Sequence, residues 1–247
     1  MIDIGRVHEV MRYPIKSMAG IAVESAIVGW HGLAGDRRFA FRRMGIDSGF
    51  PWLSASRLPE LLLYQPLGLD EQSGEPLPTH VRTPDGAQFA LGSADLDRLV
   101  SERLGQPVEW MRLKHGIFDE AAVSVIGLAT IAAIGRQVGQ ALDRRRFRAN
   151  IVIDTEGSQP FQEDEWVGGA LIFGQGDAGA VVRVTLCDVR CAMINLDPAT
   201  AEKDGRVMNA VVQLNDNNAG VYATVVRSGP VRVGDPVRFV AEPSAPG

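Results

Sequence analysis

The sequence predicts a mainly β protein with a few helices, and two features of its apolar pattern support this fold class. Short apolar runs, many alternating with polar residues, recur along the 247 residues and are bounded by Gly, Pro and Asp. Few stretches carry the 3.6-residue apolar spacing of a helix. The composition, 45% apolar and 22% charged, is that of a globular protein with ample material for a core.

Predicted strands occur in both halves of the chain. Each is a short run rich in apolar residues and bounded by turn-forming residues. In the first half they span residues 5–12, 21–28, 38–42, 61–65, 80–82, 88–91 and 108–112. In the second half they span residues 122–126, 150–154, 170–173, 180–186, 221–226 and 237–240. This many short strands indicates a β-rich architecture.

Three segments are predicted as helices. Residues 93–104 start with polar residues and stop at Gly105, while residues 128–142 place their apolar side chains on one stripe. Residues 207–214 form the third and shortest candidate. Residues 65–78, rich in Gly, Pro and acids, are predicted to be an exposed loop, and residues 242–247 a disordered tail. A loop at 115–121 suggests two modules, 1–118 and 119–241.

Charge and hydropathy disfavour two classes of partner. The formal net charge of −5 argues against nucleic acid as the main partner, because phosphate binding needs a basic surface. No apolar run approaches the roughly 18 residues that span a bilayer. The first residues already resemble a strand rather than a signal peptide, so we expect a cytoplasmic protein without a membrane partner.

The two cysteines, Cys187 and Cys191, are four residues apart. In a strand this spacing corresponds to about 13 Å, which is too far for a disulfide. A structural zinc site or an iron–sulfur cluster would normally need four ligands with a recognisable spacing. The simplest alternative is a pair of buried strand cysteines without chemistry.

Residues 174–179 match the pattern G-x-G-x-x-G of dinucleotide-binding proteins. That pattern requires a following helix whose N-terminus receives the pyrophosphate. Here a β-branched run, 180–186, follows instead. We therefore interpret residues 174–179 as a hairpin loop.

Four polar patches at predicted strand ends carry most of the functional information. They are residues 13–17 (Tyr-Pro-Ile-Lys-Ser), 32–39 (Gly-Leu-Ala-Gly-Asp-Arg-Arg-Phe), 146–150 (Arg-Phe-Arg-Ala-Asn), and 189–191 (Val-Arg-Cys) with 196–200. Cationic side chains beside backbone amides suit a phosphate-bearing ligand. Each patch alone is more commonly a solvated strand end.

In this order, the patches resemble the MOSC family, named after the C-terminal domain of molybdenum cofactor sulfurase. The resemblance covers nearly the whole chain and includes residues 163–166 (Glu-Asp-Glu-Trp), 220–222 (Gly-Val-Tyr) and 233–237 (Val-Gly-Asp-Pro-Val). It implies an N-terminal β-barrel module followed by a MOSC β-barrel module. In layout the chain is similar to the mitochondrial amidoxime-reducing component and its bacterial counterparts.

The resemblance also implies roles for individual residues. Cys191 is expected to supply the thiolate ligand to molybdenum and to be the catalytic position, with the molybdenum cofactor as prosthetic group. The pterin and its phosphate are expected to be held by Lys16, Ser17, Arg37, Arg148 and Asn150, with Thr130 and Tyr222 as weaker candidates. Soft thiolate and cationic side chains match such a cofactor chemically.

Some positions depart from the family pattern. Three residues rather than two separate the cysteines, Ala149 stands where a proline is common, and Gly127 stands where a hydroxyl residue is common. The segment after Asp197 and Pro198 is also shorter. These departures leave the substrate open, and Cys187 is interpreted as structural or as a neighbour of the site.

The leading hypothesis is a molybdenum-dependent oxidoreductase that reduces N-hydroxylated or N-oxide-like compounds. Its electrons are expected from an external ferredoxin-like or flavin-dependent reductase, because the sequence shows no cluster, haem or nucleotide motif of its own. The alternatives are a non-catalytic cofactor carrier, a sulfur-transfer protein with a persulfide on Cys191, and a β-barrel binding module with an inert thiol. Pyridoxal phosphate is disfavoured, because Lys16 fits the phosphate grip and Lys114 and Lys203 lack a supporting motif.

Overall fold

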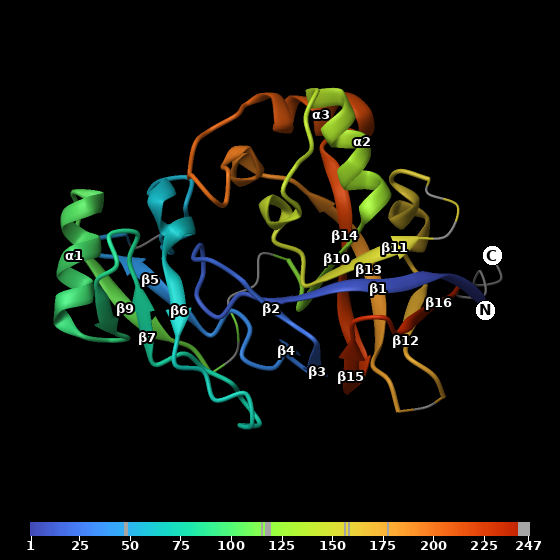
Figure 1. Cartoon of the computed structure of the whole chain (residues 1–247), viewed down its shortest axis with the longest axis horizontal. Coiled ribbons are helices and arrows are strands. Elements are labelled where there is room, and N and C mark those ends of the chain that lie inside the picture. Colours follow the sequence, from blue (N-terminus) through green and yellow to red (C-terminus); the bar gives the residue numbers. More distant parts are fainter. Residues whose placement is uncertain are drawn as a thin grey trace.

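The computed structural model describes residues 1–46, 49–114, 116, 120–155, 157, 159–176 and 178–241. Its central feature is a closed barrel of seven strands, shown on the right of Figure 1. Around the barrel the strands are β11 (Ile151–Thr155), β10 (Val123–Gly127), β14 (Asn218–Arg227), β13 (Val181–Val189), β12 (Ala170–Phe173), β16 (Pro236–Val240) and β1 (Ile2–Arg12). The strand β1 closes the ring because it pairs antiparallel with both β16 and β11.

One glycine allows this closure. At Gly5, with φ of +141°, an added Cβ would lie 2.0 Å from the Asp154 carbonyl oxygen of β11. The β1–β16 register also shifts between Asp3 and Gly5. A side chain at this position would therefore collide with the neighbouring strand, so the barrel closes only around glycine.

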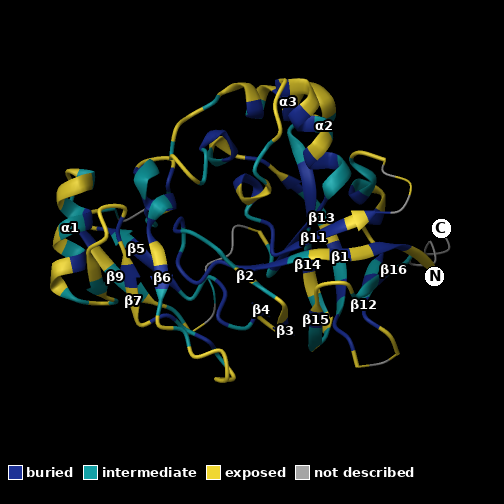
Figure 2. Ribbon diagram, viewed as in Figure 1, coloured by how far each residue is buried: buried dark blue, intermediate teal, exposed yellow. Residues whose placement is uncertain are grey.

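Each of the two parts of the molecule has a core of its own, and a further apolar cluster includes Ile126, Ile131 and Val207. The barrel interior is packed with aliphatic side chains from alternate strand positions, including Val7, Val10, Ile151, Ile153 and Val182. A second core lies in the N-terminal half, shown on the left of Figure 1, and includes Ile15, Met18, Phe39, Phe41 and Leu96. Figure 2 shows buried residues along the barrel strands and exposed residues on the outer face of α1 (Ala94–Leu104).

The remaining strands form small sheets and one barrel extension. The sheet of β15, β3 and β4 comprises Gly229–Arg232, Ser25–Gly29 and Gly32–Leu33. A two-stranded sheet joins β5 (Phe39–Arg43) to β9 (Val108–Arg112). A further sheet comprises β6 (Gln65–Leu67), β7 (His80–Arg82) and β8 (Gln88–Ala90), and β2 (Ile21–Val23) pairs with β1.

The α-helices begin within one residue of their predicted starts, and two of the three also end within one residue of their predicted ends. Ser93 caps α1 by accepting the Leu96 N–H, and Gly105 ends it in the left-handed conformation. The helix α2 (Leu128–Val138) crosses between the parallel strands β10 and β11, which need such a connection. It lies beside α3 (Arg206–Asn215) on the outside of the barrel, at the top of Figure 1.

The fold class predicted from the sequence is confirmed, with four local corrections. Residues 61–65 are not a strand, because Pro59 starts a 3₁₀ helix, η1 (Pro59–Leu63), and β6 then occupies the start of the predicted loop. The predicted helix 128–142 ends at Val138, because Gly139 adopts φ of 85°. Predicted strand 21–28 is two strands, and the short strands β4 and β15 were missed. The hairpin assignment for residues 174–179 is confirmed, since β12 and β13 pair antiparallel around it.

The two predicted modules exchange strands. The strand β1, from the first module, completes the barrel, while β15, from the second, pairs with β3. The division at 118/119 itself stays a prediction, because residues 117–119 lie outside the described residues, as does the predicted tail 242–247. Within the described part of the chain, none of the helices has the length and apolar character needed to span a membrane.

Candidate functional site

The end of β1 and the loop before β5 form the first side of the candidate site. Pro14, which has no N–H to extend the ladder, follows β1, and the chain turns at residues 16–18. An isolated bridge pairs Ile15 with Phe39, and the Lys16 N–H donates to the Phe39 carbonyl at 2.8 Å. These contacts place Lys16 and Ser17 beside the loop that carries Arg37.

A buried carboxylate fixes this loop. Asp36 is buried, accepts the Tyr13 N–H at 2.6 Å and forms an ion pair with Arg37. The preceding Gly35 has φ of +77°, and a Cβ there would lie 2.3 Å from the Pro76 carbonyl oxygen. The glycine–aspartate pair in this motif is therefore needed to place Arg37.

Two of the predicted cations meet on one aromatic ring. The guanidinium carbons of Arg148 and Arg37 lie 4.3 and 5.4 Å from the centroid of the Tyr13 ring. Arg37 Nη2 donates to the Arg148 carbonyl at 3.0 Å, and Arg148 Nη1 donates to the Met18 carbonyl at 2.7 Å. Burial raises the pKa of Tyr13 to about 12 and outweighs the lowering effect of Arg148 and Arg37. Arg37 and Arg148 are thus held together beside Ser17.

Three of the seven described non-glycine residues with positive φ lie at this place. Ser17, Arg37 and Arg148 all have left-handed φ values, 68°, 45° and 51°. Such a conformation costs a non-glycine residue about 1–2 kcal/mol, and strain of this kind concentrates at ligand-binding sites. The Ser17 hydroxyl is also buried without a hydrogen-bond partner among the described residues. A cluster of two guanidinium groups beside an unsatisfied hydroxyl fits a phosphate-bearing cofactor.

The thiol lies at the other side of the candidate site. Cys191 is exposed and immediately precedes the 3₁₀ turn η4 (Ala192–Asn195), just after β13. The adjacent Arg190 is buried and donates from Nη1 to the Phe147 carbonyl at 2.8 Å. Because Phe147 precedes Arg148, this bond ties the thiol-bearing segment to the cation-bearing segment.

A second buried arginine holds η4 from the opposite direction. Arg146, in η2 (Arg144–Phe147), donates to the Asn195 carbonyl at 3.1 Å and to Asp197 Oδ2 at 2.6 Å. The residues after Cys191 also reach the N-terminal half, where Leu196 packs with Ala55 and Leu62. Figure 1 shows this orange segment extending from the barrel toward the cyan helix η1. The candidate site therefore lies where the two halves meet.

Two predicted residues have mixed roles. The Lys16 ammonium lies 5.0 Å from the centroid of the Phe50 ring, at the edge of the site. Asn150 is buried, its Oδ1 accepts from Arg37 and from the Ser124 N–H, both at 3.2 Å, and its Nδ2 donates to the Met11 carbonyl. Asn150 thus supports Arg37, and its direct contact with a cofactor stays a prediction.

The structure places the two weaker candidates elsewhere on the barrel. Thr130 is fully buried on α2, where its hydroxyl accepts the Phe161 N–H at 2.7 Å. Tyr222 lies on β14, opposite Ser124 of β10 and Leu186 of β13. These contacts do not join Thr130 or Tyr222 to the Arg37–Arg148 pair, so their cofactor roles stay predictions.

Cys187 differs from Cys191 in its surroundings. It is half-buried near two acidic residues of η3 (Gln162–Trp166). Burial, followed by the charge and hydrogen bond of Asp164, raises the pKa of the Cys187 thiol to about 11. Its neighbour Glu163 is buried, and burial raises the pKa of that carboxyl as well. This environment keeps Cys187 protonated, and the role of Cys191 as the reactive thiol stays a prediction.

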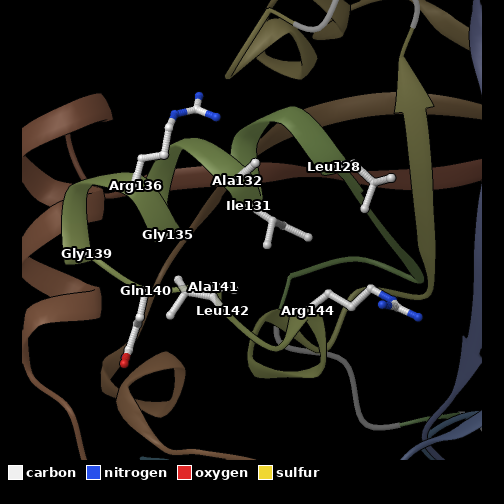
Figure 3. Close-up of a pocket in the computed structure, with 10 residues that line it drawn as sticks. All are labelled: Leu128, Ile131, Ala132, Gly135, Arg136, Gly139, Gln140, Ala141, Leu142 and Arg144. Atoms are coloured by element: carbon white, nitrogen blue, oxygen red, sulfur yellow. The ribbon is translucent and has the colours of Figure 1, made fainter.

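A cavity of about 640 Å³ lies between α2 and the segment that follows it. Figure 3 shows Ile131 and Leu128 on one side and Leu142 and Arg144 on the other, with Arg136 pointing away. The described lining shares no residue with the predicted cofactor-binding set. Arg144 is the first residue of η2, which also contains Arg146.

Sequence reasoning gave no joining role to the buried residues that connect the two sides of the site, although Arg146 and Arg190 lie in the patches it selected. The most important are Asp188, Arg190, Ser124 and Arg146. Asp188 left one signal, because it interrupts the otherwise largely apolar end of β13 with a carboxylate. The other three look like ordinary polar residues at strand ends, and only the fold brings them together.

Two family descriptions together match nearly all of the chain. The MOSC N-terminal beta barrel domain matches residues 4–98, and the MOSC domain matches residues 86–238. A comparison with curated proteins finds no match. Among solved structures, the YuaD protein from Bacillus subtilis is similar over 97% of each chain, with 13% identity and a TM-score of 0.53. This likeness supports the fold.

A second solved structure, YiiM from Geobacillus stearothermophilus, covers 49% of this chain and 54% of its own, with 17% identity and a TM-score of 0.37. Family membership rests on the match to the MOSC domain, which covers more than half of the chain. The chain belongs to the MOSC domain family, which is associated with the molybdenum cofactor.

Proposed function

We propose that this protein binds the molybdenum cofactor, with the Cys191 thiolate as ligand to molybdenum, and reduces N-hydroxylated or N-oxide-like compounds. The observation that carries the proposal is the strained cluster of Ser17, Arg37 and Arg148, tied through Arg190 to the segment bearing Cys191. Family membership supports the choice of cofactor.

The residues on the first side of the site would hold the phosphate of the cofactor. Arg37 and Arg148 present planar donor groups suited to phosphate oxygens, and their positions are fixed by Asp36 and by the Met18 carbonyl. The buried Ser17 hydroxyl would gain the partner that it lacks among the described residues. Lys16 would add a further cation at the rim.

The cofactor, when bound, supplies the redox chemistry, in which an N-hydroxylated substrate, two electrons and two protons yield the amine and water. The protein supplies the soft thiolate of Cys191, which is exposed and can be reached from solvent. We propose that the electrons come from an external ferredoxin-like or flavin-dependent reductase. The proposal retains the cytoplasmic location expected from the sequence.

The proposal is tested with protein purified from a cofactor-competent host, an artificial one-electron reductant and an aromatic hydroxylamine. Turnover is expected in the parent and in Cys187→Ala, because Cys187 lies in the separate environment of Asp164. Turnover is expected to be lost in Cys191→Ala. Undiminished activity in Cys191→Ala would exclude the proposed thiolate ligand.

The second candidate function is a carrier of the cofactor or of sulfur. The exposure of Cys191 favours it, because a surface thiol can hand its cargo to another protein. Stoichiometric release of cofactor to an apo-enzyme, or a persulfide on Cys191, without any turnover of hydroxylamines, would establish this alternative. Rapid reaction of Cys191 with a thiol probe would argue against the third possibility, an inert binding module.

A further inference from the structure

A buried ion pair lies directly before Cys191. Asp188 and Arg190, at the end of β13, have exposed fractions of 2% and 7%. Asp188 Oδ2 lies 2.9 Å from Arg190 Nη2 and accepts the Ser124 hydroxyl at 3.2 Å. The carboxylate therefore faces the guanidinium as a close ion pair within the protein.

Arg190 uses its other nitrogens to join three chain segments. Its Nε donates to the Ala219 carbonyl of β14 at 2.7 Å, and its Nη1 donates to the Phe147 carbonyl at 2.8 Å. Phe147 immediately precedes the strained Arg148, and Arg190 immediately precedes Cys191. The guanidinium thus sets the spacing between the cation and the thiol.

The same network continues to the first side of the site. The Ser124 N–H donates to Asn150 Oδ1 at 3.2 Å, and this oxygen also accepts from Arg37 Nη1 at 3.2 Å. Ser124 therefore contacts Asp188 with its hydroxyl and contacts Asn150, the partner of Arg37, with its backbone N–H. Both groups that would grip an anion, Arg37 and Arg148, are connected to the Asp188–Arg190 pair.

Stability alone does not account for this arrangement. Burying a carboxylate and a guanidinium is costly, and apolar residues of similar volume are often at least as stabilising. The fold also makes room for the pair, because Gly220, with φ of +85°, would place a Cβ 3.1 Å from Arg190 Nη2. A buried pair kept at such a cost is best explained by the geometry that it imposes.

We infer that Asp188 is a positioning residue. It orients Arg190 and thereby fixes Cys191 relative to the anion-binding pair Arg37 and Arg148. The inference rests on the proposed function in treating these residues as one site. It predicts that an anion bound at the arginines changes the reactivity of the Cys191 thiol, and that this effect depends on Asp188.

The test measures alkylation of Cys191 by iodoacetamide in the metal-free protein, with and without inorganic pyrophosphate. The affinity for pyrophosphate is first measured by calorimetry for each variant. At about nine times its dissociation constant, pyrophosphate is expected to slow alkylation of the parent about tenfold, since about nine-tenths of the protein is then occupied. Asp188→Asn, at equal occupancy, is expected to show less than about twofold protection.

The matched control is Asp95→Asn, which neutralises an exposed pair with Arg98 and is expected to keep the protection of the parent. Full protection in a folded Asp188→Asn variant would overturn the inference, as would a parent without protection. If Asp188→Asn does not fold, Ser124→Ala removes a single bond to Asp188, and intermediate protection is expected. Unchanged protection in Ser124→Ala would then overturn it.

Failure of the proposed function gives a different pattern. If the protein holds no molybdenum and turns over no hydroxylamine, but pyrophosphate still protects Cys191 through Asp188, the inference stands without that activity. If the role of Asp188 is purely structural, Asp188→Asn will lower the free energy of unfolding and leave the protection by pyrophosphate unchanged. The protection ratio, compared at equal occupancy, separates these cases.

Discussion

Replacing Arg146 by alanine tests whether the turn after Cys191 is held from η2. The side chain is 5% exposed and makes three contacts to this turn and its continuation. It donates to the Ile194 and Asn195 carbonyls at 3.4 and 3.1 Å and to Asp197 Oδ2 at 2.6 Å. The substitution Arg146→Ala removes all three hydrogen bonds at once.

The expected loss follows from the burial of the partners. A hydrogen bond from a charged donor contributes about 1.5–3 kcal/mol, but Asp197 is 29% exposed and can be hydrated once the arginine is gone. The lost bond to the Asn195 carbonyl and the lost packing therefore dominate, giving about 3 kcal/mol of unfolding free energy. In a chain of this length, that corresponds to a decrease in Tm of roughly 6–12 °C.

The assay is urea unfolding of Arg146→Ala beside Arg145→Ala. Arg145 belongs to the same turn, but it is 44% exposed and pairs with its neighbour Asp143. Its loss is expected to cost less than about 1 kcal/mol, as for other surface pairs. If Arg146→Ala costs no more than Arg145→Ala, the turn after Cys191 is not held by Arg146 and the reasoning fails.

Three further outcomes are expected. Burial raises the pKa of Glu163, so the stability that its protonated form contributes is present below about pH 4.3 and is lost as the pH rises through the folded pKa. The variant Glu163→Gln should therefore unfold at a higher urea concentration than the parent at pH 8 but not at pH 4. An equal difference at both pH values would refute this. In Gly220→Ala, the new Cβ would lie 2.6 Å from the Val125 carbonyl oxygen, at a backbone φ of +85°. The substitution should lower the free energy of unfolding by about 2 kcal/mol or more, and a neutral effect in calorimetry would contradict that geometry. With a thiol pKa of about 11, about one in a thousand Cys187 side chains is ionised at pH 8. A titration with a thiol reagent should therefore show one fast phase, from Cys191, that disappears in Cys191→Ser. Two fast phases would show that Cys187 is also reactive.

Much of the barrel could be predicted from local pattern. The strands β10, β11 and β12 alternate or bury apolar residues, and their predicted bounds differ from the observed ones by at most one residue. The pairing of β1 with both β11 and β16 could not be predicted, because it joins residues more than 140 positions apart and depends on the close approach at Gly5. The segment 61–65 was predicted wrongly because a short apolar run, here Leu61 to Tyr64, does not distinguish a strand from a 3₁₀ turn.

The candidate site shows the same division between local and tertiary information. Arg37 and Arg148 could be proposed from the family resemblance, because the motifs that contain them are continuous in the sequence. The role of Arg190 could not, because its partners, Asp188, Ala219 and Phe147, come from three different segments. Buried charge pairs are recognised only when the fold shows what surrounds them.

The most direct test of the proposed function is the molybdenum content of protein expressed in a cofactor-competent host, measured for the parent, Cys191→Ser and Cys187→Ser. The account predicts near-stoichiometric molybdenum in the parent and in Cys187→Ser, and its loss in Cys191→Ser. Molybdenum retained in Cys191→Ser, or absent from all three despite added molybdate, would contradict the assignment of Cys191 as the thiolate ligand of a bound molybdenum cofactor.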